Sequence, residues 1–208
     1  TNVLVLVEHG EGQLKNSTVE LITAARVFGT VGAVVVGAPG TTEKLQGALA
    51  EAGAETIYAA ESDQAESLLI TPEVDAVSGL AAQLQVPVYL RYRNGQQIAG
   101  RVGARVASGV LYNTNNITAE KTAEISIFGG AYTVTASAAG ASPVFTLAPG
   151  SLDPEPQAAA GNVQQVELPG AGPTAVTITS FAPAEQGDRP DLTEANIVAV
   201  SYTHLRAH

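Results

Sequence analysis

The first 110 residues alternate short apolar runs with stretches of helical periodicity. The runs, at 3–7, 31–36, 56–59 and 86–92, have the length and composition of buried strands. Each is followed by a segment in which apolar residues recur every three or four positions, at about 17–26, 41–52, 71–84 and 96–107. Four such units in succession are typical of a parallel sheet covered by helices.

Local signals predict where these helices begin and end. Ser17 and Glu20 have the spacing of a capping box, in which both side chains bind free backbone N–H groups. Gly53 and Gly109 stand where a helix could end in a left-handed residue. The Thr-Pro-Glu run at 71–73 predicts an N-cap, a first-turn proline and an acid placed against the helix dipole.

After residue 111 the apolar period becomes two. Apolar residues alternate with threonine and serine at 132–137 and 176–179, which predicts antiparallel or edge strands. Residues 128–131 predict a turn, and 150–161, with two prolines, predict a loop. We therefore expect an α/β fold with a mostly parallel sheet, helices on both faces and antiparallel strands in the second half.

Composition excludes several classes of protein. The 208 residues include no Cys, which excludes a disulfide scaffold, a zinc–thiolate site, an iron–sulfur cluster and a cysteine nucleophile. The formal net charge of -10 argues against nucleic-acid binding, which needs clustered cations. No apolar run approaches the roughly 20 residues of a membrane span, and no signal-peptide pattern opens the chain. We expect a soluble, cytoplasmic protein without membrane insertion.

Three places carry candidate binding chemistry. The loop 37–42 joins a strand to a helix N-terminus, where backbone N–H groups could hold a phosphate, although it matches neither a P-loop nor the dinucleotide fingerprint. His9, beside Glu8, ends the first strand, where parallel sheets gather active-site groups. Residues 91–95, Arg-Tyr-Arg-Asn-Gly, combine cations with an aromatic ring that could stack on a nucleotide. The structural alternative for His9 is a loop hydrogen bond, and the alternative for 91–95 is a solvated edge.

Arg101 and Arg105 lie one turn apart on one helix face, which indicates surface ion pairing or contact with a partner. The sequence shows no Ser, His and acid constellation, no usefully spaced carboxylate pair and no His cluster. We therefore predict no catalytic, cofactor-binding or metal-binding residue in this chain. An autonomous nucleotide-binding module using His9, Gly37 and Arg91 remains an alternative, and so does an enzyme with His9 as general base.

The C-terminal octapeptide 201–208, Ser-Tyr-Thr-His-Leu-Arg-Ala-His, interrupts a strand-like run. Back-translated, it resembles one reading frame of a transposon adapter used in sequencing libraries. We interpret 200–208 as non-native, exclude its two His from the site search, and expect the chain to be the N-terminal part of a longer protein.

The order of several motifs resembles the N-terminal domain of the electron transfer flavoprotein alpha subunit. The similarity extends over essentially 2–198, and its main blocks are 3–9, 20–26, 34–37, 53–58, 97–105, 126–132 and 188–195. The match is poorer between 88 and 116, where 89–93 and 112–116 differ from the usual family pattern. This resemblance implies a Rossmann-like fold of the adenine nucleotide alpha hydrolase type over 1–188, with 189–199 beginning an FAD-binding domain.

The resemblance also implies a function. Family members form a heterodimer with a beta subunit and carry electrons on one FAD from acyl-CoA and other dehydrogenases to a membrane quinone oxidoreductase. The FAD lies mainly in the C-terminal domain of the alpha subunit, and a structural AMP belongs to the beta subunit. Hence we expect residues 1–199 to be a scaffold and subunit-docking domain that binds no FAD and catalyses nothing.

Overall fold

A nine-stranded sheet organises the computed structural model, which describes residues 1–10, 12–182 and 197. Residues Thr1–Ile178 form one unit, and the few described positions beyond it belong to a second unit. The predicted start of a further domain at 189–199 and the segment 200–208 that we interpret as non-native lie outside the described residues, Ile197 excepted.

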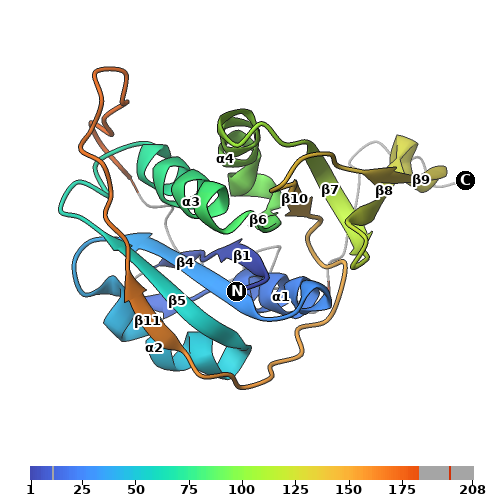
Figure 1. The fold of residues 1–208 in the computed structure, drawn as a ribbon, viewed down its shortest axis with the longest axis horizontal. Helices are drawn as coiled ribbons and strands as arrows, with labels where there is room; N and C mark the ends of the chain where they lie inside the picture. The colour runs from blue at the N-terminus through green and yellow to red at the C-terminus, as the bar shows by residue number, and fades with distance from the viewer. Residues whose placement is uncertain (11, 183–196, 198–208) are drawn as a thin grey trace, which may run out of the picture. The chain divides into compact units, whose positions relative to one another are not determined.

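The four predicted strand–helix units are confirmed (Figure 1). Their strands are β1 (Val3–Leu6), β4 (Val31–Gly37), β5 (Ala54–Glu61) and β6 (Val88–Arg91). Their helices are α1 (Asn16–Ala25), α2 (Thr41–Ala52), α3 (Thr71–Leu84) and α4 (Tyr92–Arg105). A short hairpin of β2 (His9–Gly10) and β3 (Gln13–Leu14) precedes α1, and a 3-10 turn, η1 (Arg26–Phe28), follows it.

The strand order explains where a ligand could bind. The full order is β11-β5-β4-β1-β6-β10-β7-β8-β9, and every pair from β11 to β7 is parallel. The chain proceeds outward from β1 through β4 to β5, then crosses back to β6 on the other side of β1. In open parallel sheets such a reversal leaves a crevice at the carboxyl ends of the two diverging strands.

Alternate residues of each central strand face opposite helical layers. Val3, Val5 and Val35 pack in the layer that holds α1 and α2. Leu4 and Leu6 pack in the other layer, against α3 and α4. All residues of β1 and β4 are buried, as expected for strands covered on both faces.

The second half contributes both predicted and unpredicted strands. The antiparallel part is confirmed: β7 (Val110–Ile117), β8 (Thr122–Ile127) and β9 (Tyr132–Ser137) are joined in series, with the predicted turn at η2 (Phe128–Gly130). The sequence analysis missed β10 (Val144–Leu147), a fully buried parallel strand between β6 and β7. It also missed β11 (Asn162–Gln165), which pairs parallel to β5.

The strand expected at 176–179 is wrong. Only an isolated bridge between Thr177 and Leu68 forms there, with Leu69 N–H donating to the Val176 carbonyl and Ile178 N–H to the Ser67 carbonyl. The alternation of two apolar residues is too short to decide between a strand and a loop held by two hydrogen bonds.

Several predicted helix ends are displaced. The capping box at Ser17 is wrong, because α1 begins at Asn16, after Lys15, and no side chain caps it. Thr71 is already helical, and Ile70, at φ 52°, precedes it, whereas Pro72 and Glu73 take the predicted first-turn positions. Gly53 ends α2 at φ 119°, as predicted, but α4 ends at Arg105, before Gly109.

Candidate functional site

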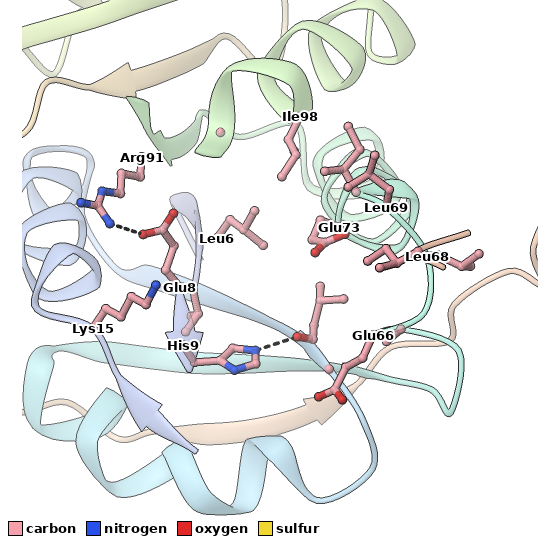
Figure 2. Close-up of a pocket in the computed structure, with 17 residues that line it drawn as sticks. Leu6, Glu8, His9, Lys15, Glu66, Leu68, Leu69, Glu73, Arg91 and Ile98 are labelled. Atoms are coloured by element: carbon pink, nitrogen blue, oxygen red, sulfur yellow. Dashed lines mark hydrogen bonds and ion pairs between the residues drawn. The ribbon is translucent and has the colours of Figure 1, made fainter. Parts of the chain in front are cut away.

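A pocket of about 370 Å³ lies at the crevice that the strand order predicts (Figure 2). Residues at the carboxyl ends of β1, β4 and β6 line it, together with the start of α3. Its apolar wall includes Leu6, Leu69 and Ile98. Its charged lining consists of Glu8, His9, Lys15, Glu66, Glu73 and Arg91. The structure thus brings together two sequence candidates, His9 and Arg91, that are 82 positions apart.

Glu8 and Arg91 hold the two diverging strands together. Arg91 Nη1 donates to Glu8 Oε2 at 2.9 Å, and both side chains are largely buried. Ser17 Oγ donates to the same carboxylate oxygen at 3.1 Å. The hydroxyl of the fully buried Thr18 accepts a hydrogen bond from the Glu8 N–H and donates one to the Glu8 carbonyl. Arg91 is therefore committed to an internal ion pair that joins β1, α1 and β6.

His9 has a structural partner. Its Nε2 donates to the Val36 carbonyl at 2.8 Å, which ties the end of β1 to β4 (Figure 2). Among the pocket residues that the structure describes, none has a hydroxyl or thiol side chain. A general base needs a proton to abstract or a nucleophile to activate, and these described residues offer His9 no such partner.

Glu73 is the carboxyl group that the sequence did not single out. Burial raises the pKa of Glu73. Its own backbone N–H and the nearby His9 lower the pKa, but by less than burial raises it. Its Oε2 is buried and has no hydrogen-bond partner among the described residues. A buried carboxyl oxygen without a partner in the protein favours a ligand or water that can hydrogen-bond to it.

The carboxylate of Glu61 binds the loop at 37–42, which the sequence offered only as a candidate phosphate site. Gly40 N–H donates to Glu61 Oε2 at 2.9 Å and Thr42 N–H donates to Glu61 Oε1 at 2.7 Å. Burial on its own raises the pKa of Glu61, but the hydrogen bonds from Thr42 and Gly40 outweigh this effect and lower it. The N–H groups at the start of α2 are thus satisfied from the end of β5, and a phosphate at 37–42 would have to displace Glu61.

The other cationic candidates, Arg101, Arg105 and the run 91–95, have different outcomes. Arg105 pairs with Asp75 of α3, as the ion-pairing interpretation predicts, and Arg101 is exposed. The side chains of 92–94 are outside the description, so the nucleotide-stacking interpretation of 91–95 stays untested. Within the described ranges 1–10, 12–182 and 197, no cluster of three or more His, Asp or Glu could hold a metal ion.

Glu61 and Glu73 could be found only with difficulty from the sequence. Glu73 was noted as a first-turn acid, and its pocket position depends on α3 packing over β1. Glu61 ends a strand 21 positions after Gly40, and only the parallel pairing of β4 with β5 brings them together.

A parallel sheet with a switch-point pocket, and helices on both faces, defines a Rossmann-like α/β domain. The loop that would carry a phosphate is closed by an internal acid. The chain belongs to the electron transfer flavoprotein domain family, whose model matches residues 3–171. The resemblance inferred from the motifs is thereby confirmed.

Relatives carry the same family assignment. The chain is 45% identical over 197 residues to the electron transfer flavoprotein subunit alpha of Mycobacterium leprae, covering 94% of this chain and 62% of that protein. It is 49% identical over 175 residues to the same-named protein of Mycobacterium tuberculosis strain H37Rv, covering 83% of this chain and 55% of that protein. Identity to the Syntrophomonas wolfei protein of that name is 27% over 205 residues. The chain spans about six tenths of the length of these relatives.

None of the helices in the described part of the chain combines the length and apolar character that a bilayer crossing requires.

Proposed function

We propose that this chain is the scaffold and docking part of an alpha subunit in a heterodimeric FAD electron carrier. Its proposed partner is an electron transfer flavoprotein beta subunit. Through that complex it would serve acyl-CoA and other dehydrogenases and a quinone oxidoreductase. Family membership and the shared name of the relatives support the subunit assignment.

The observation that carries the scaffold role is the closed phosphate loop. FAD and AMP both carry phosphates, and in the strand–helix loop at 37–42 the backbone N–H groups of Gly40 and Thr42, which could hold a phosphate, bind Glu61 instead. Arg91, one of the cations that line the pocket, is held by Glu8. We therefore propose that the FAD binds outside residues 1–188 and that the chain performs no catalytic step of its own.

Purification of the full 208-residue chain tests this proposal. The chain alone is expected to show no stoichiometric flavin absorbance, whereas coexpression with the cognate beta subunit should yield a copurifying complex. A stoichiometric yellow flavin band on the isolated chain would contradict the scaffold role, and failure to associate with the beta subunit would contradict the docking role.

Calorimetry separates the proposal from the nucleotide-binding alternative. Titrations with AMP, ATP and FAD are expected to show no binding tighter than about 1 mM, or about -4 kcal/mol, because the loop N–H groups are already satisfied. Micromolar binding of any of them to the chain would favour the nucleotide-binding module instead.

A further inference from the structure

The switch-point pocket contains a carboxyl oxygen that the described part of the chain leaves unsatisfied. Glu73 lies in the first turn of α3 and lines the pocket, and its Oε2 is buried without a hydrogen-bond partner among the described residues. Neither of the two ion pairs that join described residues includes Glu73. In Figure 2 its carboxyl group projects from α3 toward Leu6 across the pocket. A bound hydrogen-bond donor would remove the free-energy cost of leaving this oxygen unpaired.

The other charged groups of the pocket are bound elsewhere or exposed to solvent. Arg91 is held in its internal ion pair, and His9 donates to a main-chain carbonyl of β4. Lys15 and Glu66, which have opposite charges, are both exposed. The buried part of the pocket therefore presents an acid without a neutralising ion pair among the described residues, and this favours a ligand that is a donor or a cation over an anion.

The rest of the pocket wall is mostly apolar. Nine of its 17 lining residues are Ala, Val, Leu or Ile. Leu6 and Ile98 belong to the buried layer that contains α3, and Leu69 is 47% exposed. The volume of about 370 Å³ lies within the range of roughly 300–1,000 Å³ that is usual for small-molecule sites. An apolar wall with an unsatisfied carboxyl group suits a small molecule that has an apolar body and a polar end.

Two backbone hydrogen bonds hold one wall of the pocket in place. Leu69 N–H donates to the Val176 carbonyl and Ile178 N–H donates to the Ser67 carbonyl, both at 2.8 Å. Beside them Ile70 has φ 52°, a left-handed conformation that is strained for a β-branched residue. Leu69, Ile70 and Ile178 all line the pocket. Backbone strain of this kind is concentrated at ligand sites and persists only where the surrounding structure enforces it.

From these observations we infer that the pocket binds a small primary amine with an apolar body. The ammonium group would donate to Glu73 Oε2, and the apolar part would pack against Leu6, Leu69 and Ile98. An ammonium group both satisfies the carboxyl oxygen and pairs with its charge, whereas a carboxylate or phosphate group would be repelled. The inference goes beyond the docking role, because it concerns a site on the isolated chain and requires neither the beta subunit nor flavin.

Calorimetric titration of the full 208-residue chain with two matched probes tests the site. We expect 2-phenylethylamine to bind with a Kd of about 1 mM or tighter. In 3-phenylpropionate a carboxylate replaces the amine on the same ring and linker, and this probe should bind at least about tenfold more weakly. Weaker binding of the amine, or a smaller preference over the carboxylate, would overturn the inference and leave the proposed function intact.

Variants determine whether the amine binds in the pocket, because a chain with a net charge of -10 attracts cations over its whole surface. Glu73→Gln should weaken binding of 2-phenylethylamine at least about tenfold. Its matched control is Glu43→Gln, which changes the exposed first-turn acid of α2, outside the pocket lining, and should leave the Kd within about twofold. Unchanged binding by folded Glu73→Gln would overturn the inference.

A second pair of variants keeps the test valid if Glu73→Gln does not fold, which thermal unfolding of the free chain shows. Leu69→Lys adds a positive charge to the pocket wall and should weaken binding of the amine at least about tenfold. Val27→Lys changes a residue of similar exposure, 42% against 47%, outside the pocket lining, and should leave the Kd within about twofold. Equal binding by the two lysine variants would overturn the inference.

Discussion

The centre of the sheet and its hairpin end are built from similar residues but differ in what surrounds them. In β10 all four residues are buried, and Phe145 has no exposed surface. In β9 five of six residues are exposed, although Tyr, Val and Thr are equally strand-prone. Helices cover both faces at the centre and neither face of β9 is buried. The stability of this fold should therefore come mainly from the parallel centre, and the hairpin should contribute little to it.

Phe145→Ala should give the largest effect. The ring stacks near Phe28 and lies 6.0 Å from the Tyr89 ring in the fully buried layer beneath α1. Removing a buried phenyl ring should lower the free energy of unfolding by about 3–5 kcal/mol. Denaturant unfolding monitored by circular dichroism measures this loss. A loss below about 1 kcal/mol would mean that the centre does not dominate stability.

Glu61→Gln should give an intermediate effect that depends on pH. The pKa of Glu61 is below its usual 4.5, so its stabilisation is complete above the pKa of the unfolded chain and disappears as pH falls through the lower folded value. Loss of this cap should lower stability by about 1 kcal/mol at pH 7.

Unfolding curves of wild type and Glu61→Gln between pH 7 and pH 3 measure this dependence. The wild type should lose stability more steeply below about pH 4.5, and the two proteins should converge in acid. Glu66→Gln is a matched control, because Glu66 is exposed and the Gln change leaves no N–H group without a partner. Parallel profiles for wild type and Glu61→Gln would show that the carboxylate does not hold the loop.

Phe128→Ser should give the smallest effect on stability. The ring is exposed, and its one described ring contact is with Tyr132 of β9. The free energy of unfolding should change by no more than about 0.5 kcal/mol, measured in the same denaturant assay as Phe145→Ala. A loss comparable with that of Phe145→Ala would remove the contrast between the two regions.

The strongly periodic elements were predictable because their signals are local. The apolar runs of β1 and β4 correctly predicted strands, because a strand buried on both faces consists of continuous apolar residues. Gly53 correctly predicted the end of α2, because this helix ends in a left-handed residue. The Ser17 prediction failed because the Ser17 hydroxyl donates to Glu8, which lies between β1 and β2, and does not cap the helix. β10 was missed because four residues between a Ser-Pro turn and a loop carry too short a pattern.

The amino-acid sequence by itself determined the class of fold, the acidic charge, the absence of cysteine chemistry and, through the order of its motifs, the family. These properties depend on composition and on residues near one another in the chain. Tertiary structure alone decided that Glu61 binds the loop at 37–42, that Arg91 is held by Glu8, and that β9 is the last strand of the described sheet. Each depends on which distant strands become neighbours, and that choice is made by packing the whole core.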